Sequence, residues 1–445
     1  MTLPRYKEYV DSRVEWLGEI PHHWKLVRLK DIAEVVNGFP FDSKLFESEG
    51  AHALIRIRDL NARETVTRYG GEFLIAAAVT SSDVLIGMDG DFNVGRWRGA
   101  EPALLNQRMC CVRSPSSVLS IFLGHALPIP LKAINDITYS TTVKHLSSLD
   151  VAKIRFALPN DDELTAIAAF LDRETAKIDV LITEQEKLIA LLAEKRRATI
   201  SHVVTKGINP NAPMKDSRVA WLGVVPAHWH VAPLASRYNV QLGKMLDTSK
   251  ILGKHLRPYL RVFDVQWGEI NVSGLPEMDF DESARQKFRL AVGDILVNEG
   301  GSYPGRAAIW RGELEECYYQ KALHRLRLTN PETDSSDFFY FVLHWAANQG
   351  VFIAGGNETT IEHLPAERLR RYRFAFPPKN EQKQIAMFLS VEIGRLEALK
   401  VESERAIGLL RERRSALIAA AVTGQIDVRC VMSQTIIESP ETIPV

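Results

Sequence analysis

Two segments of the chain gather arginine, lysine, asparagine and glutamine residues at short spacings. Arginine can donate two hydrogen bonds to guanine, asparagine and glutamine can pair with adenine, and cationic side chains neutralise phosphates. A base-reading surface is one interpretation of these residues, and solvated surface charge is the other. The candidates in the first segment are Arg56, Arg58, Arg96, Arg98, Asn106, Gln107 and Arg108. Those in the second segment are Lys244, Arg261, Gln266, Arg306, Gln320, Lys321, Thr359 and Thr360.

Other kinds of chemistry find little support in the sequence. Residues 300–306 resemble a phosphate loop but lack its GK[ST] ending, so a turn is predicted there. The chain has no Asn-Pro-Pro-aromatic motif for adenine methylation and no glycine-rich nucleotide fingerprint. The cysteines form no CxxC pair and have no histidines nearby at metal-ligand spacing, which predicts buried free thiols at Cys110, Cys111, Cys317 and Cys430. We expect no catalytic, cofactor or metal site.

Length and composition are those of an ordinary globular protein of two or three domains. The 445 residues are 46% hydrophobic and 25% charged. Basic and acidic residues both number 55, so net charge does not indicate a polyanionic partner. No apolar run approaches the roughly 18 residues that span a bilayer, and the N-terminus carries charges where a signal peptide would be apolar. A cytoplasmic protein without a membrane partner is predicted.

The elements that must position the candidate residues occur twice. Residues 11–24 return as residues 216–229, with Asp-Ser-Arg-Val, Trp-Leu-Gly, Pro and His-Trp in the same places. Residues 145–205 return without a gap as residues 363–423. The segments between these repeats, roughly 25–144 and 230–362, resemble each other only weakly. The chain therefore alternates constant and variable parts, and this order predicts an internal pseudo-twofold symmetry.

The second repeat predicts two long helices, one over residues 161–204 and one at the matching place in the other copy. No proline interrupts either stretch, and apolar residues recur in steps of three, four or seven. A stripe this narrow is best buried against its counterpart, so we expect an antiparallel coiled coil about 60 Å long. The expected seam comprises Ile167, Leu171, Ile178, Leu181, Leu188, Leu192, Ile385, Leu389, Leu396, Leu399, Ala406 and Leu410.

The Trp boxes, residues 16–24 and 221–229, offer two interpretations. Their indoles could stack on bases, or they could pack as anchors between domain and helix, and we favour anchoring. The first long helix leads directly into a Trp box, whereas the second ends at residues 422–427 without one. We therefore expect residues 7–24 to dock beside residues 422–427, which would bring Trp16 near Gly424.

The variable segments predict compact α+β domains. Residues 53–58 and 83–86 of the first segment have strand composition, as do residues 259–263 and 294–297 of the second. In our alignment of the two segments, Gln107 corresponds to Gln320, and Thr141–Thr142 corresponds to Thr359–Thr360.

With these features in place, the chain resembles the specificity subunits of type I restriction-modification systems over nearly its whole length. The most specific element is a Phe-Ala-x-Pro segment followed by a long helix, found twice. In the second copy it reads Phe374-Ala-Phe-Pro-Pro-Lys-Asn-Glu-Gln-Lys-Gln-Ile-Ala-Met-Phe-Leu389. The first copy departs from the family pattern at residues 160–164, where Asn-Asp-Asp-Glu-Leu replaces the Pro-Glu-Gln version.

The resemblance implies an α+β fold in which two target recognition domains are separated by two long helices. The implied division is an N-terminal segment 1–24, recognition domains 25–150 and 216–368, helical regions 151–215 and 369–430, and a tail 431–445. The implied partners are double-stranded DNA, two methyltransferase subunits and restriction/translocase subunits. S-adenosylmethionine, ATP and magnesium would then belong to the partners, and the chain itself would be a non-catalytic subunit.

In this interpretation the two domains read the halves of a bipartite, asymmetric site, and the helices set the spacing. Four residues inserted into helix 161–204 would add about 6 Å, or one or two base pairs. Two alternatives remain: a nuclease or methyltransferase with unrecognised motifs, and a coiled-coil adaptor that binds only proteins. Activity of the isolated chain on DNA would favour the first, and absence of sequence-specific DNA binding by the assembled complex would favour the second.

Overall fold

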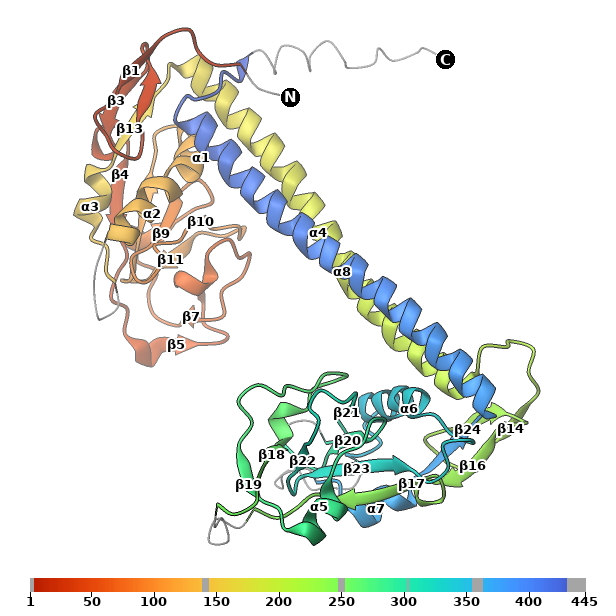
Figure 1. Ribbon diagram of the computed structural model, residues 1–445. Coiled ribbons are helices and arrows are strands. Elements are labelled where there is room, and N and C mark those ends of the chain that lie inside the picture. Colours follow the sequence, from red (N-terminus) through yellow and green to blue (C-terminus); the bar gives the residue numbers. More distant parts are fainter. Residues whose placement is uncertain (1–3, 138–143, 247–252, 302–303, 354–362, 430–445) are drawn as a thin grey trace, which may run out of the picture. The chain divides into compact units, whose positions relative to one another are not determined.

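The computed structural model describes residues 4–137, 144–246, 253–301, 304–353 and 363–429. The chain divides into two compact units, unit 1 with Met1–Gln185 and Arg405–Val445, and unit 2 with Glu186–Glu404 (Figure 1). Helices α4 (Asp161–Lys206) and α8 (Lys379–Val422) each contribute to both units. Thr141, Thr142, Thr359, Thr360 and Cys430 lie outside the described residues.

Unit 1 is built on small β-sheets covered by helices. A four-stranded antiparallel sheet has the order β10-β9-β12-β4, and a second sheet has the order β5-β7-β6-β11-β8, in which β11 runs parallel to β6. The strands of the first sheet are β4 (Glu34–Asn37), β9 (Val84–Gly87), β10 (Val94–Arg96) and β12 (Met109–Arg113). Those of the second are β5 (Phe46–Glu47), β6 (His52–Ile55), β7 (Arg68–Tyr69), β8 (Ala78–Val79) and β11 (Ala103–Leu105).

Short elements complete unit 1 on either side of these sheets. They are the hairpin β1 (Tyr9–Asp11) and β2 (Glu19–Pro21), the antiparallel pair β3 (Lys25–Arg28) and β13 (Arg155–Leu158), and helices α1 (Ser117–Ala126), α2 (Pro128–Ile137) and α3 (Ser148–Lys153). The 3-10 turns are η1 (Leu29–Asp31), η2 (Ser43–Leu45), η3 (Ile57–Asp59) and η4 (Ile75–Ala77).

Unit 2 repeats the main elements of unit 1, although its second sheet has three strands, β19-β18-β22, in place of five. Its four-stranded sheet is β17-β23-β20-β21, and β18 pairs with β22 in parallel, as β6 pairs with β11 in unit 1. The strands are β14 (Met214–Asp216), β15 (Val224–Pro226), β16 (His230–Pro233), β17 (Tyr238–Leu242), β18 (Leu256–Leu260), β19 (Glu277–Asp279), β20 (Ile295–Asn298), β21 (Ala307–Ile309), β22 (Tyr318–Tyr319), β23 (Leu323–Leu328) and β24 (Arg373–Phe376). The helices are α5 (Glu282–Phe288), α6 (Ser336–Asn348) and α7 (Ala366–Arg371), with turns η5 (Leu234–Ser236) and η7 (Val262–Asp264).

The strand that follows each Trp box pairs with the strand that precedes each long helix. Lys25 lies opposite Leu158 in unit 1, and His230 lies opposite Phe376 in unit 2. The two kinds of repeat have different sequence offsets, yet these pairings have the same register. The repeats in the sequence therefore correspond to repeats in the structure. In both units a strand pairing joins the Trp box to the start of a long helix.

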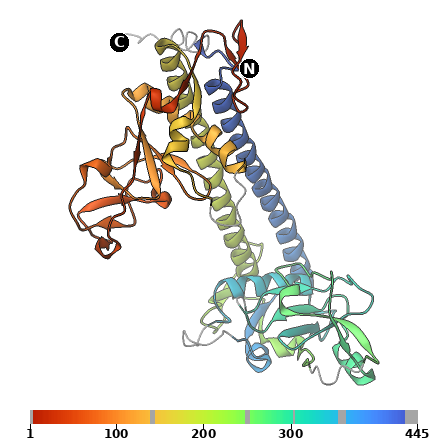
Figure 2. The same cartoon turned by 90° about the vertical axis from the view of Figure 1, so that its left-hand side faces the viewer.

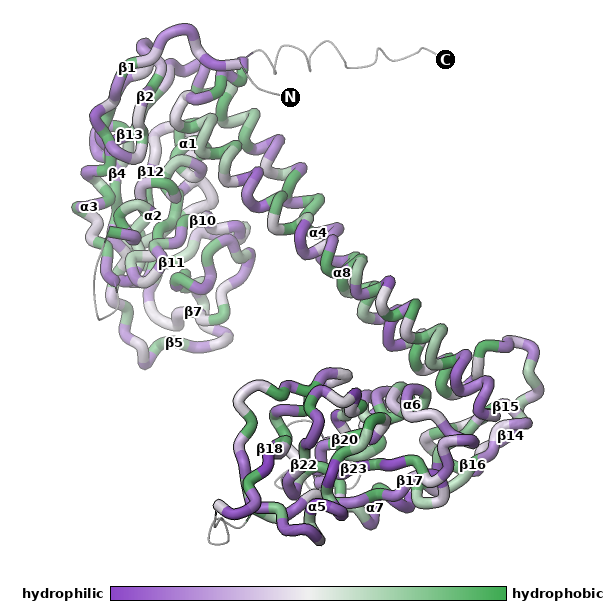
Figure 3. The backbone as a smooth tube through the Cα atoms, in the orientation of Figure 1, coloured by the Kyte–Doolittle hydropathy of each residue, from purple (hydrophilic) through white to green (hydrophobic). Residues whose placement is uncertain are grey.

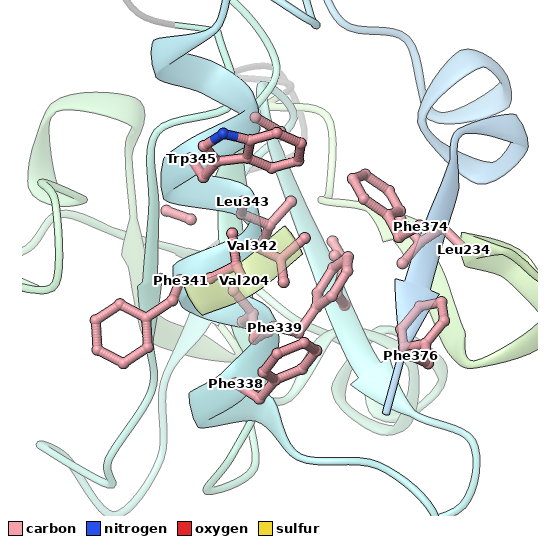
Figure 4. Packing of buried hydrophobic residues seen from close by; sticks show 14 of the residues in the cluster. Val204, Leu234, Phe338, Phe339, Phe341, Val342, Leu343, Trp345, Phe374 and Phe376 are labelled. Atoms are coloured by element: carbon pink, nitrogen blue, oxygen red, sulfur yellow. The ribbon is translucent and has the colours of Figure 1, made fainter. Parts of the chain in front are cut away.

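Aromatic residues fill much of the core of unit 2. Phe338, Phe339 and Trp345 of α6 face Phe374 and Phe376 of β24 in one buried cluster (Figure 4). The rings of Phe339 and Phe374 meet edge to face at 5.1 Å between centroids, an arrangement that aromatic pairs favour. The corresponding cluster in unit 1 is formed by α1, β13 and the two long helices.

Two predicted strands end earlier than expected. Residues 53–58 and 259–263 were expected to be extended, but β6 ends at Ile55 and β18 at Leu260, and each passes into a 3-10 turn, η3 or η7. The cause is a buried carboxylate three residues on: Asp59 accepts the backbone N–H of Arg56, and Asp264 accepts that of Arg261. This capping chemistry turns the chain sharply.

Within each unit α4 and α8 pack side by side, running antiparallel (Figures 1 and 2). In unit 1 Arg414 pairs with Asp179 at 3.0 Å, and in unit 2 Lys195 pairs with Glu392 at 3.4 Å. Hydrophobic and hydrophilic residues alternate along both helices, as a narrow apolar seam requires (Figure 3). The antiparallel coiled coil expected from the sequence is present.

The expected seam needs correction at several positions. The buried seam residues are Ile167, Leu171, Ile178, Leu192, Ile385, Leu389 and Leu396, while Ala406 and Leu410 are half-buried. Leu181, Leu188 and Leu399 are exposed, Leu181 by 51%. From Leu171 onward the less exposed positions alternate in steps of four and three, and these steps reach Ile182 and Ile189. Residue type alone does not show which of two adjacent apolar residues faces the seam. The orientation of the helix against its partner decides this.

The N-terminal segment docks beside the end of α8, as predicted. Tyr9 donates its hydroxyl hydrogen bond to the carbonyl of Gly424 at 2.9 Å, and the backbone N–H of Asp427 donates to Pro4 at 2.7 Å. A Cβ at Gly424 would lie 2.3 Å from Cδ of Pro21, so the approach requires glycine. We call this contact of residues 4–24 with residues 420–429 the terminal junction.

The Trp boxes anchor domains to helices. Trp24 and Trp229 are buried, and their indole N–H groups donate to Glu163 at 3.1 Å and to Glu381 at 3.0 Å. Trp16 packs edge-on against Phe156, with ring centroids 5.9 Å apart. This confirms the anchoring interpretation, because a buried, hydrogen-bonded indole is not available to stack on a base.

One segment corrects the expectation that no apolar stretch is long enough to cross a membrane. Ser117–Ile137 meets that criterion by length and composition. The segment is divided into α1 and α2, and Leu119, Phe122 and Leu131 lie in the core of unit 1. Packing in that core accounts for its apolar composition.

Candidate DNA interface

The ends of two parallel strands create a hollow in unit 1. Strand β6 ends at Ile55 and β11 at Leu105, and the backbone N–H of Asn106 donates to the carbonyl of Ile55 at 3.1 Å. The loop after β11 is thereby held against the turn after β6. Gly38 lies beneath this loop, and a Cβ there would be 2.0 Å from the carbonyl oxygen of Asn106. A residue without a side chain is thus required for the close approach.

Five of the seven predicted residues of the first segment line this hollow, which measures about 560 Å³. Its lining residues are Phe41, Ser43, Phe46, Arg56, Ile57, Arg58, Asn106, Gln107 and Arg108. Arg58 donates to the hydroxyl of Thr67 at 2.7 Å, and Arg108 pairs with Asp89 at 2.9 Å. The lining thus includes three guanidinium groups and two amides, which can bind phosphate oxygens and base edges.

Arg96 and Arg98 lie elsewhere in unit 1. They line a different cavity, of about 700 Å³, together with His125, Asp172 and Arg414 among others. Arg96 donates to the carbonyl of Ser120 at 2.6 Å, and burial lowers the pKa of its guanidinium. The structure therefore separates these two arginines from the other five candidates.

In unit 2 the predicted residues follow the same scaffold. The backbone N–H of Gln320 donates to the carbonyl of Leu260 at 3.0 Å, and a Cβ at Gly243 would lie 2.2 Å from the carbonyl oxygen of Gln320. These contacts match those of Asn106, Ile55 and Gly38. Asn106, rather than Gln107, is thus the counterpart of Gln320, and Gln107 corresponds to Lys321. The alignment made from the sequence is therefore shifted by one residue here. The chain between the two parallel strands differs in length between the units, so the sequence did not fix the alignment.

Arg261, Gln266 and Arg306 form a connected set in unit 2. Arg261 makes a bidentate pair with Asp264, with N–O distances of 2.8 and 2.9 Å, and these hydrogen bonds raise the pKa of the guanidinium. Gln266 donates to the carbonyl of Phe263 at 2.8 Å, while Arg306 donates to the side-chain oxygen of Gln266 at 2.5 Å. The planar groups are thereby held in fixed orientations by charge-assisted and amide hydrogen bonds.

Lys244 and Lys321 differ in their availability. The Lys244 ammonium donates to the carbonyl of Asp279 and lies 4.6 Å from the ring centroid of Phe280, whereas Lys321 is exposed. Lys244 is therefore engaged within unit 2. Thr359 and Thr360, also predicted, lie outside the described residues.

The sequence reasoning missed Phe263, whose side chain is 62% exposed beside Arg261. It also missed Phe41, Ser43 and Phe46, which line the hollow in unit 1. A usable signal was present: Arg-x-x-Asp occurs as residues 56–59 and again as residues 261–264, with the same spacing as the Trp boxes. That pattern marks equivalent turns, and the residues inside it differ between the copies.

Other reactive groups are accounted for by burial. Cys110, Cys111 and Cys317 are buried free thiols, as predicted, and burial raises the pKa of each to about 12. Among the described residues no group of three or more histidine, cysteine or carboxylate side chains could hold a metal ion.

The fold and these sites define a class of protein: two repeated α+β units, each with cationic and amide side chains at the same strand ends, built on two long helices. Residues 21–190 and 277–404, more than half of the chain, match the family model described as type I restriction modification DNA specificity domain. The chain therefore belongs to this family of specificity subunits. Its role is recognition of DNA sequence, and the catalytic activities of such complexes lie on other subunits.

Individual relatives cover nearly the whole chain. It is 27% identical over 433 residues to the EcoBI specificity subunit of Escherichia coli, covering 94% of this chain and 90% of that one. The MjaVIII specificity subunit of Methanocaldococcus jannaschii is 22% identical over 437 residues, covering 95% and 97%.

Two solved structures share the fold. A chain from a study of complex assembly and conformational transition of the type I restriction-modification system gives a TM-score of 0.62 at 16% identity, covering 91% of this chain and 98% of that one. The specificity subunit from Thermoanaerobacter tengcongensis gives 0.55 at 15% identity, covering 92% and 98%.

Proposed function

We propose that the chain reads a bipartite, asymmetric DNA site, with one half-site read by each unit. The observation that carries this proposal is that equivalent turns hold different side chains. Arg56 corresponds to Arg261, but Arg58 corresponds to Phe263, Asn106 to Gln320, and Gln107 to Lys321. The same backbone frame with different functional groups would favour different bases.

We assign the recognition domains to residues 25–150 and 216–368. The remaining parts are an N-terminal segment 1–24, helical regions 151–215 and 369–430, and a tail 431–445. In the first domain, Arg56, Arg58, Asn106, Gln107 and Arg108 are the proposed contacts. In the second they are Arg261, Gln266, Arg306, Gln320 and Lys321, with Thr359 and Thr360 retained from the sequence prediction. We do not assign Arg96, Arg98 or Lys244 to base readout, because Arg96 and Lys244 donate to backbone carbonyls and Arg98 lines a different cavity from the hollow.

The long helices would serve as spacer and as docking surface. Helix α4 has 46 residues and is therefore roughly 70 Å long. Its Leu181, Leu188 and Leu191 are exposed rather than buried in the seam, as are Leu399 and Leu409 of α8. Exposed leucines at helical spacing are typical of a surface that another helix covers. We propose that two methyltransferase subunits dock on such surfaces and that restriction/translocase subunits join this core.

S-adenosylmethionine, ATP and magnesium would be bound by those partners. The methyltransferase must turn its target adenine out of the duplex, and two domains that hold flanking phosphates would steady the distorted DNA. A protein with this role would work in the cytoplasm, where the DNA is.

Methylome sequencing tests the proposal. Cells that express this chain with its methyltransferase partner should carry one methylated, two-part, asymmetric sequence. Gln107→Ala should relax the sequence of one half-site only, and Gln320→Ala should relax the other only. Glu47→Ala, on β5 outside the hollow, is the control and should leave both half-sites unchanged. If either amide substitution altered both half-sites equally, the assignment of one half-site to each unit would be wrong.

A further inference from the structure

We infer that Phe263 is a base-stacking residue of unit 2, at a position where unit 1 has a cation. This inference rests on the proposed function and adds to it a particular kind of contact with the second half-site. Phe263 lies in η7, between Arg261 and the buried carboxylate of Asp264.

The backbone of the turn that carries the exposed ring is held by hydrogen bonds. The Asp264 carboxylate accepts the backbone N–H of Arg261 at 2.8 Å and also binds its guanidinium, so both ends of the turn are fixed. The backbone carbonyl of Phe263 accepts a hydrogen bond from Gln266 at 2.8 Å. These bonds fix the backbone on both sides of Phe263, and the residue is 62% exposed.

One side of the ring is already covered by a cation. The guanidinium carbon of Arg261 lies 4.0 Å from the ring centroid of Phe263, a cation–π distance. Because Asp264 neutralises Arg261 and fixes its plane, this pair is a preformed platform rather than a mobile side chain. Bases have two π faces, and stacking on an aromatic ring is a common way to hold a base that has left its neighbours.

The surroundings of the ring fit a DNA-facing position. Gln266 and Arg306, both proposed base or phosphate contacts, are joined by a 2.5 Å hydrogen bond, and Gln266 is bonded to the Phe263 backbone. Exposed apolar side chains that insert beside such groups can partly unstack a base step, and pyrimidine–purine steps yield most easily. The expected target is therefore a flexible step within the second half-site.

Unit 1 places a different chemistry at the same position. Its turn η3 has Arg56 and buried Asp59 in the places of Arg261 and Asp264, but Arg58 stands where Phe263 stands. A guanidinium contributes charge, whereas a phenyl ring contributes a stacking surface. The two units should thus differ in salt dependence as well as in base preference.

The test uses the full chain assembled with its methyltransferase partner and a duplex bearing the methylated sequence. Phe263→Ala should weaken specific binding about 5- to 150-fold, and Phe263→Trp should restore most of the loss. The slope of log affinity against log salt should stay unchanged for Phe263→Ala, because no charge is lost, and should fall by about one for Arg58→Ala. Val292→Ala, which removes another exposed apolar side chain of unit 2 (72% exposed), should bind normally.

An abasic scan of the second half-site locates the stacked base. At one position, removal of the base should weaken DNA binding by the wild-type protein but should weaken binding by Phe263→Ala only slightly further, since the two changes delete the same contact. Strictly additive losses at every position, or wild-type affinity for Phe263→Ala, would overturn the stacking role. So would a loss of assembly with the methyltransferase in place of a loss of DNA affinity. A wild-type complex that recognised no two-part site would instead overturn the proposed function itself.

Discussion

Glu163 should be the most sensitive of the polar residues that contact the terminal junction. Its side chain is only 2% exposed and sits at the start of α4. One carboxylate oxygen lies 2.8 Å from Arg429 and the other 3.1 Å from the Trp24 indole nitrogen, while His23 Nε2 lies 2.9 Å from both. The carboxylate of α4 therefore joins two other segments that are far apart in sequence, one at the N-terminal end and one after α8. The closest counterpart, Glu381 in unit 2, is 21% exposed and pairs with His228 and Trp229.

Replacing Glu163 by glutamine keeps its volume and removes its charge. Removing one partner of a buried ion pair costs about 3–5 kcal/mol, and a hydrogen bond to a charged group is worth about 1.5–3 kcal/mol. Because Arg429 is half-exposed, we expect Glu163→Gln to lower the stability of this contact by less than a fully buried pair would, about 2–3 kcal/mol. The more exposed Glu381→Gln should cost about 1 kcal/mol.

Hydrogen exchange measures this cost where it arises, which matters because a protein of two units need not unfold in one step. In Glu163→Gln, protection of the backbone amides in residues 4–28 should fall about 30- to 150-fold. Protection in β16 and β24 of unit 2 should be unchanged. Wild-type protection in Glu163→Gln, or a larger loss in Glu381→Gln than in Glu163→Gln, would refute the reasoning.

Three further predictions concern pH, packing and spacing. Burial, and secondly the charge of Arg196, lower the pKa of His344 from 6.5 to about 4. The free energy of unfolding of unit 2 should therefore fall by about 3 kcal/mol as pH falls from 6.5 to 4. Urea titrations of His344→Gln over the same pH range should show no such loss. Gly38→Ala should displace the loop at Asn106, since its Cβ would lie 2.0 Å from that carbonyl oxygen, and methylome sequencing should show one relaxed half-site. Gly408→Ala, in α8, has open space around its Cβ and no positive φ, so it should leave both half-sites unchanged. Seven residues inserted into both α4 and α8 preserve the seam and add about 10 Å, so the methylated site should gain about three base pairs of spacer; an unchanged spacer would contradict the ruler role.

The sign of the pH effect follows from the burial of His344, and its surroundings agree with it. Its Nδ1 lies 3.1 Å from the side-chain nitrogen of Asn348, which can donate only to a neutral imidazole. The pocket around it presents Arg196, Arg197, Lys400 and Glu397, mainly cations that oppose protonation. The folded pKa therefore lies below the unfolded one, and stability is complete above pH 6.5 and is lost toward pH 4.

Much of the architecture could be predicted from residue order. The long helices, their antiparallel pairing and the terminal junction all followed from two repeats with different offsets, because a helix with one narrow apolar stripe must bury it and a Trp box must have a partner. The seam was less predictable. Leu181 and Ile182 are both apolar and adjacent, and only the phase fixed by packing shows that Leu181 faces outward.

The candidate site was predictable by residue type but not by place. Arg56 and Arg96 are alike in sequence terms, yet one lines the hollow at the ends of β6 and β11 and the other is half-buried beside α1. A single phenylalanine gives no sequence signal for a binding site. Phe263 is exposed because it lies in a turn capped by the carboxylate of Asp264, and only the structure shows this turn.

The sequence by itself determined that this protein is a duplicated molecule with two variable segments and two paired long helices, because periodicity and repetition are properties of the chain's order. Tertiary structure alone decided which cations face a common surface, which leucines stay exposed and where an aromatic ring stands free. Those outcomes depend on close approaches between distant backbones, such as that of Gly38 to Asn106, and no local pattern encodes such an approach.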